Sequence, residues 1–240
     1  MIILEYKRLK EIFWKKYFCS YDVLNLLIPY QTLLSTLCSE LEIKKTDVIL
    51  EAGCGTGNLA LMIKNNGSKV IGLDNCNVAL ELYRTKDPVA NTILGNLTDI
   101  LPFPNNYFDK IVSNNTLYII DKGKQILALK ELYRILKPGG KIVISNPIIT
   151  GSPIKIYLSH IKLSIKATGV LKTIKVLLRM LLPTTKIFWF NMKIKKMYHY
   201  SLFELNGQKN LLMQSGFIKI SPTKLVYADQ NILNSAFKPI

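Results

Sequence analysis

The residues best suited to chemistry are a glycine cluster and an acid that follows it. Gly53-Cys54-Gly55-Thr56-Gly57 comes directly after a short apolar run, 47–52, and Asp74 ends the next apolar run, 69–74. Glycines in such a loop let the backbone approach a ligand that any side chain would block. A carboxylate at the end of the neighbouring strand can accept two hydrogen bonds from a ribose diol. The pair therefore predicts a crevice that binds a nucleoside.

The spacing of the glycines narrows the class of ligand. They follow the pattern GxGxG, whereas a dinucleotide-binding loop carries GxGxxG. A phosphate-binding P-loop needs Gly-Lys-Ser/Thr, which this loop lacks. A glycine cluster alone can also be only a structural turn, so the prediction depends on strand, cluster, helix, strand and acid occurring in that order.

Apolar runs and helical periodicity predict the elements that hold this crevice. Strands are expected at 47–52, 69–74, near 91–95, 108–113 and 141–145, and helices at 58–66, 76–86 and 122–136. This alternation predicts an α/β fold, a doubly wound and mostly parallel sheet with right-handed crossovers. The tail, 217–238, is expected to form antiparallel strands at the sheet edge.

More helices are expected on both sides of this core. Two lie at 4–18 and 23–40, the second of them split at Pro29. Another covers 153–182, with a break at Gly169 and its end at Pro183. A last helix is expected over 202–214, with Ser201 as its cap.

Several motifs within the core resemble those of one family. They are Leu50 to Gly57, Asp74, Gly95-Asn96-Leu97 with Leu101-Pro102-Phe103, Phe108-Asp109, and Leu132 to Gly140. Together, residues 47–146 resemble the core of class I S-adenosylmethionine-dependent methyltransferases, in the branch that includes the ubiquinone- and menaquinone-type enzymes. The resemblance implies methyl transfer as the activity and S-adenosylmethionine as the cofactor. It also implies a Rossmann-like sheet of seven strands in the order 3-2-1-4-5-7-6.

The same resemblance divides the chain, 1–240, into parts of a single domain. A helical lid would occupy 1–44 and the cofactor-binding core 45–147. A basic helical insertion over 148–200 would form the acceptor pocket and the rest of the lid. A final helix and edge strands would occupy 201–240.

The resemblance also assigns the residues of the cofactor site, and it implies no metal ion. Glu51 would lie near the amino group of the cofactor and Asp74 on its ribose hydroxyls. Asn96 stands where the family usually has Asp, but its amide oxygen can still accept a hydrogen bond from the adenine amino group. Glu51 as a helix cap and Asn96 as a turn residue are the alternatives. The full set of contacts implied is Glu51, Gly53, Cys54, Gly55, Gly57, Asp74, Asn75 (or Cys76 beside it), Asn96, Leu97 and Asn114.

The acceptor is the part that the sequence defines least. The loop 113–116 lacks the prolines of methyltransferases that act on adenine or glutamine, and no cysteine beyond Cys76 offers a cytosine-C5 nucleophile. Aromatic residues gather in 13–21 and 188–200, the expected lid segments, which favours a small apolar or lipid-like acceptor. Tyr17, Tyr21 or Tyr30 is expected to close over the cofactor. The candidate catalytic residues are Tyr118, His160, His199 and Tyr200, and for each a purely structural role is the alternative.

The charge of the chain indicates an anionic partner or a compositional bias. The formal net charge is +16, and residues 132–203 contain 13 bases and no acid. Such a surface suits membrane headgroups, nucleic acid or an acidic metabolite. Only four of the 32 bases are arginines, which also fits an AT-rich genome and weakens a role in reading nucleic-acid sequence.

One predicted helix, 170–182, is amphipathic. Lys172, Lys175 and Arg179 share one side and apolar residues fill the other, as in helices that lie in a membrane interface. Trp189 and the basic residues Lys193, Lys195 and Lys196 would add to the attraction. An ordinary lid helix packed on the sheet, with its lysines in water, is the alternative.

These observations lead to one prediction and two rivals. We expect a cytoplasmic methyltransferase with a small-molecule or lipid acceptor, with peripheral attachment at the inner face of the membrane as an open alternative. The rivals are an RNA or protein methyltransferase that uses 132–203 as its substrate platform, and a non-catalytic cofactor-binding partner subunit. Four scattered cysteines without a CxxC pair fit a reducing compartment, and no apolar run approaches the length of a spanning helix. The atom methylated and the oligomeric state stay open.

Overall fold

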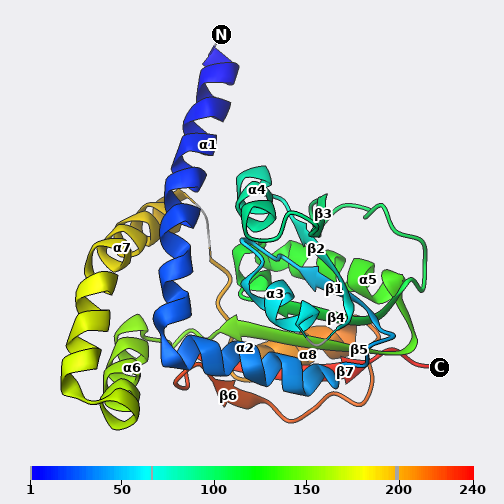
Figure 1. Cartoon of the computed structure of the whole chain (residues 1–240). Helices are drawn as coiled ribbons and strands as arrows, with labels where there is room; N and C mark the ends of the chain where they lie inside the picture. The colour runs from blue at the N-terminus through cyan, green and yellow to red at the C-terminus, as the bar shows by residue number, and fades with distance from the viewer. Residues whose placement is uncertain (1, 66, 198–199) are drawn as a thin grey trace.

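A seven-stranded sheet forms the centre of the protein (Figure 1). The computed structural model describes residues 2–65, 67–197 and 200–240, and side chains outside 1–11, 66 and 194–199. The strand order is β3-β2-β1-β4-β5-β7-β6; β7 runs antiparallel to β5 and β6, and the other pairs are parallel. The predicted fold class and strand order are confirmed. The strands are β1 (Val48–Ala52), β2 (Lys69–Asp74), β3 (Asn91–Leu94), β4 (Phe108–Asn114), β5 (Leu136–Pro147), β6 (Lys224–Val226) and β7 (Asn231–Phe237).

Helices cover both faces of the sheet, because successive strand side chains point to opposite sides. Leu50 and Ile111 belong to the core beneath α5 and α8. Their neighbours Ile49 and Val112 belong to the opposite core, beneath α2, α3 and α4. Each face therefore buries a full layer of apolar side chains. The helices are α2 (Ile28–Leu41), α3 (Asn58–Lys64), α4 (Asn77–Lys86), α5 (Gln125–Ile135) and α8 (Gly207–Gln214).

The chain reverses its direction of winding at β1, and this creates the place for a ligand. β1 pairs with β2 on one side and with β4 on the other, all parallel. The helices that follow β1 and β4 lie on opposite faces. The loops after these strands therefore diverge at the carboxyl edge, which is where open α/β sheets bind ligands.

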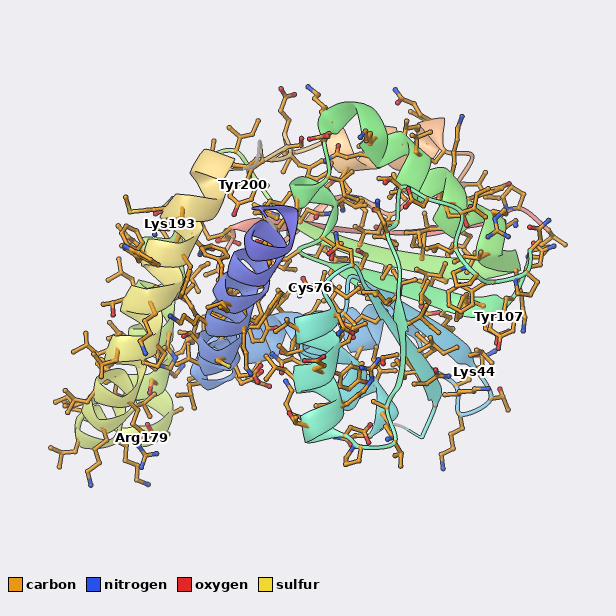
Figure 2. All side chains as sticks on the ribbon, turned by 90° about the horizontal axis from the view of Figure 1, so that it is seen from above. Lys44, Cys76, Tyr107, Arg179, Lys193 and Tyr200 are labelled. Carbon is orange, nitrogen blue, oxygen red and sulfur yellow. The ribbon has the colours of Figure 1, made fainter. Side chains whose placement is uncertain are left out.

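Three further helices stand beside the sheet. The first, α1 (Ile2–Tyr21), continues into a 3₁₀ turn, η1 (Asp22–Leu26), before α2. Pro29 is the second residue of α2, so the predicted split is confirmed. After β5, α6 (Pro153–Thr168) and α7 (Val170–Met197) form a hairpin that turns at Gly169, as predicted. In both views α1 lies between α7 and the sheet (Figures 1 and 2).

The prediction that Pro183 ends a helix is wrong, because Pro183 lies inside α7. Proline removes one backbone hydrogen bond and costs a helix interior about 3 kcal/mol. Burial on one face of α7 continues across this position, since Met180, Ile187 and Phe190 are all buried. The packing of this face offsets the local cost, and the helix continues to Met197.

Two other predicted boundaries also differ. Ser201 does not cap a helix: α8 begins at Gly207, and the Ser201 N–H donates to the carbonyl of Tyr118. Phe203 forms a parallel bridge with Ile148, so this backbone pairs with the chain after β5 instead of coiling. β5 begins at Leu136, ahead of the predicted 141–145. Among the described helices, none combines the length and apolarity that crossing a bilayer requires.

Candidate functional site

A cavity of about 970 Å³ lies at the carboxyl edge of the sheet, where the strand order predicts a ligand. Its floor is formed by the ends of β1, β2 and β4 and the loops that follow them. α1 forms one wall through Trp14, Tyr17, Phe18 and Tyr21. The cavity is therefore polar on the side of the sheet and aromatic on the side of α1.

The three loop glycines have different structural roles. All have positive φ, +79° at Gly53, +52° at Gly55 and +76° at Gly57. A Cβ on Gly53 would come within 2.2 Å of Thr116, and one on Gly57 within 2.3 Å of Tyr83. A Cβ on Gly55 would meet only Phe18, at 3.8 Å, because this glycine faces the cavity. Gly53 and Gly55 line the cavity. Gly57, also predicted to contact the cofactor, does not line it and instead directly precedes α3.

Asp74 fixes the glycine loop against the end of β2. Its Oδ2 accepts the Gly55 N–H at 2.8 Å, and its Oδ1 accepts the Cys76 N–H at 2.9 Å. Burial raises the pKa of Asp74, and these backbone N–H groups act in the opposite direction. Each carboxylate oxygen keeps a second lone pair. Asp74 can therefore hold the loop and accept hydrogen bonds from a ligand diol at the same time.

Glu51, at the end of β1, is buried without a full set of partners. Its side chain is 3% exposed, and its Oε2 has no hydrogen-bond partner in the described part of the chain. Burial raises the pKa of Glu51 well above its ordinary value, and the nearby Asp74 adds to the rise. A buried carboxyl in this state is costly unless a ligand satisfies it. A cationic group in the cavity would do so.

Two amides give the cavity further unpaired polar atoms. Asn114 Oδ1 and Asn58 Nδ2 are buried without partners among the described residues, and both residues line the cavity. Asn58 is held in place because its Oδ1 accepts from Lys86 at 2.9 Å and from Asn25 at 3.0 Å. Sequence reasoning missed Asn58; the signal available was its position directly after the glycine loop, at the start of the helix.

The remaining cofactor residues predicted from the sequence also line the cavity. Cys54 is buried, and burial raises the pKa of its thiol. Leu97 is 5% exposed, whereas Asn75 and Asn96 are exposed. The Asn96 Oδ1 accepts the Thr98 N–H at 3.2 Å, which is the turn geometry proposed as its alternative role. The lining includes Cys54, Asn75, Cys76, Asn96 and Leu97.

The candidate catalytic residues separate into two groups. Tyr118 and Tyr200 line the cavity with ring centroids 5.1 Å apart. Burial raises the pKa of Tyr200 to about 12 and that of Tyr118 further, so both are neutral phenols at pH 7. His160 does not line the cavity: it is 1% exposed, and its Nδ1 accepts the Ile28 N–H, which joins α6 to α2. His199 lies outside the described residues.

The aromatic wall on α1 is held in place by α7. Tyr17 and Tyr21, two of the tyrosines expected to close over the cofactor, line the cavity, and so does Tyr30 from α2. Phe190 of α7 packs edge-on against Phe13 of α1, with ring centroids 5.0 Å apart, and lies 6.1 Å from the Tyr17 ring. The hairpin thus supports the wall, and none of its described side chains lines the cavity.

Comparison with known proteins shows which proteins the chain resembles. Residues 50–144 match the methyltransferase domain family. The chain is 33% identical over 150 residues to the ubiquinone/menaquinone biosynthesis C-methyltransferase of Francisella philomiragia, covering 54% of this chain and 56% of that one. It is 37% identical over 107 residues to the demethylmenaquinone methyltransferase of Symbiobacterium thermophilum, covering 40% and 41%. The chain spans about half the length of the curated relatives it matches.

Solved structures share the fold. A phosphoethanolamine N-methyltransferase of Haemonchus contortus, in complex with S-adenosyl-L-methionine, matches with a TM-score of 0.62 at 17% identity, over 93% of this chain and 57% of that one. A Haloferax volcanii complex of the Trm112 activator with a methyltransferase matches at 0.60 and 12% identity, over 86% and 88%. Residues 50–144 therefore match a methyltransferase domain family, and the predicted resemblance to class I S-adenosylmethionine-dependent methyltransferases is confirmed.

The residues of the cavity fit the cofactor of this class, S-adenosylmethionine. The unpaired Oε2 of Glu51 suits its ammonium group, and Asp74 keeps lone pairs for its ribose hydroxyls. Gly55 leaves open the space that a side chain would fill. Tyrosines and Trp14 on the opposite side offer π faces to a sulfonium.

Proposed function

We propose that this protein transfers a methyl group from S-adenosylmethionine to a small apolar or lipid-like acceptor. The observation that carries the proposal is the division of one cavity into a polar floor, with Glu51 and Asp74, and an aromatic wall on α1. The bound cofactor supplies an electrophilic methyl group. The polar floor would bind the cofactor, and the aromatic wall would offer an apolar surface to the acceptor.

The protein's own residues would act through position and desolvation. A displacement at carbon is accelerated when the nucleophile is held in line and water is kept out. The rings of Tyr17, Tyr21 and Trp14 line the side of the cavity away from the sheet. Tyr118 and Tyr200, neutral at pH 7, can donate hydrogen bonds that orient an acceptor, but they do not serve as bases there.

The position of the basic region favours this function over a nucleic-acid or protein substrate. Of residues 132–203, only Tyr200 lines the cavity within the described part of the chain. The cations of α6 and α7 therefore stand away from the place of methyl transfer. A macromolecular substrate guided by them would still have to reach a cavity behind α1.

The experiment incubates the purified chain with methyl-labelled S-adenosylmethionine and an extract of the source cells, followed by separation into organic, RNA and protein fractions. Glu51→Gln, which should weaken cofactor binding, is the control that ties the label to this active site. Label in the organic fraction supports the proposal. Label in RNA or protein overturns the acceptor class, and bound cofactor without any transfer would indicate a non-catalytic partner subunit.

A further inference from the structure

The outer side of α7 exposes an apolar surface that faces away from the rest of the protein. Leu171, Leu178, Leu182 and Trp189 recur at spacings of 7, 4 and 7 residues, so they form one stripe along the helix. They are 78%, 66%, 71% and 50% exposed. The opposite side of α7, with Met180, Ile187 and Phe190, is buried. The stripe is therefore additional to the apolar residues that attach α7 to the protein.

A row of cations lies beside this stripe. Lys175, Arg179, Lys186 and Lys193 recur at spacings of 4, 7 and 7 residues, between the exposed apolar stripe and the buried side of the helix. All are exposed. The Lys193 ammonium lies 3.7 Å from the centre of the Trp189 ring, which joins the row to the stripe.

The preceding helix repeats the arrangement. On α6, Ile154, Leu158 and Ile165 are 70%, 60% and 42% exposed and share one side. Lys155, Lys162 and Lys166 follow the same helix beside them. The exposed sides of α6 and α7 together are called the outer face of the hairpin below. Figure 2 shows the side chains of both helices projecting away from the sheet, with Arg179 at the end of the molecule opposite Lys44.

The positive charge of the outer face of the hairpin indicates which kind of partner it can bind. The sequences of α6 and α7 contain ten cations and no acid. None of the eight cations whose side chains the structure describes forms an ion pair with another described residue. A second copy docked on the same face would oppose cations with cations, which is unfavourable. An exposed apolar stripe edged by lysines and carrying a tryptophan matches a helix that lies in the interface of an anionic bilayer.

We propose that the outer face of the α6–α7 hairpin binds the surface of an anionic membrane, with the leucine stripes at the acyl boundary and the cations on headgroups. The long stems of the lysines cover apolar surface while their ammonium groups reach the phosphates. The packing of Phe190 on α1 then places the aromatic wall of the cavity next to the bilayer. The binding itself does not depend on the proposed methyl transfer.

The test is flotation of the 240-residue chain with vesicles of phosphatidylcholine, with and without phosphatidylglycerol. Each cation near an anionic surface contributes roughly fivefold to binding. The variant K172Q/K175Q/R179Q should therefore bind mixed vesicles about 100-fold more weakly than the natural chain. Its matched control is K44Q/K69Q/K130Q, which removes the same charge from exposed residues off the hairpin that form no ion pair within the described chain. This control should bind as the natural chain does.

The apolar stripe is tested separately with L178Q/L182Q, exposed positions where folding should be unaffected, as checked by thermal melting. This variant should also lose vesicle binding. With Trp14→Phe, Trp189 is the sequence's single tryptophan, and its emission should shift to the blue when mixed vesicles are added. Equal binding by the hairpin and control triple variants would overturn the proposal, as would equal binding to both vesicle types. A dimer that L178Q/L182Q dissociates, or RNA binding without vesicle binding, would assign the face to another partner.

Discussion

Replacing Glu51 with glutamine should weaken cofactor binding while leaving the free protein as stable or more stable. The change keeps the shape of the side chain, which is 3% exposed, and removes its charge. In the free protein the Oε2 has no partner within the described chain, and burial raises the pKa of the carboxyl. Burial of the natural carboxyl therefore lowers the stability of the free protein, and a ligand that pairs with Oε2 can remove this penalty.

The expected magnitudes follow from that environment. A hydrogen bond to a charged group contributes about 1.5–3 kcal/mol, so the dissociation constant for S-adenosylmethionine should rise about 10- to 150-fold. A neutral amide is less costly to bury than a carboxylate, so the free energy of unfolding without ligand should rise by about 1 kcal/mol at pH 7. For a chain of this length that corresponds to a melting temperature about 2–4 °C higher.

The pH dependence has a defined sign. The folded-state pKa of Glu51 is raised, so the folded protein holds a proton that the unfolded chain releases. The contribution of the protonated Glu51 carboxyl to the free energy of unfolding is therefore fully present below the ordinary pKa of glutamate. This contribution is lost as the pH rises through the raised pKa of Glu51 in the folded protein. Between these two values, binding of an ammonium group should release a proton from Glu51, and Glu51→Gln should abolish this release.

Titration calorimetry in buffers of different ionisation enthalpy measures both the affinity and the proton release. Asp47→Asn is the matched control, because Asp47 is a buried carboxylate remote from the cavity that accepts from Lys110 at 3.1 Å. Breaking this buried pair should lower stability by about 3 kcal/mol and leave the affinity unchanged. If Glu51→Gln bound S-adenosylmethionine with unchanged affinity and unchanged proton release, Glu51 would not be the partner of the ammonium group.

Four further substitutions test the rest of the cavity. Gly55→Ala should lower the free energy of unfolding by roughly 1–2 kcal/mol, because of its positive φ, and should weaken cofactor binding at least tenfold. Gly57→Ala should lose more stability in a thermal melt, because its Cβ would meet Tyr83. Equal melting temperatures of the two variants would contradict this. Asp74→Ala removes the acceptor for the Gly55 N–H and should weaken binding about tenfold by calorimetry, and unchanged affinity would remove the ribose assignment. Tyr200→Phe keeps the ring but removes the phenol, so turnover should fall about tenfold with cofactor affinity unchanged; full turnover would assign Tyr200 a packing role.

The glycine loop and Asp74 on the polar floor of the cavity could be predicted from the sequence because their determinants are local. Gly53, Gly55 and Asp74 occur at the ends of adjacent parallel strands, and register alone brings such ends together. Whether the Asn96 side chain faces a ligand depends on the local turn in which this residue lies. In the structure its Oδ1 accepts the Thr98 N–H within that turn. The position of His160 could not be predicted, because its partner, Ile28, is 132 residues away in the chain.

The sequence by itself determined the α/β class, and it placed the glycine loop and Asp74 at the ends of two strands, because these follow from apolar periodicity and from residues that are near neighbours in the chain. The strand order was implied by the resemblance of the core motifs to a known family, and the sheet confirms it. Tertiary structure decided how the helices outside the sheet are used. The periodicity of 170–182 fits both a packed lid and an interfacial helix, because an amphipathic pattern does not say which side is covered. Only the packing of Met180 and Phe190 against the protein shows that the leucine stripe of α7 is left exposed.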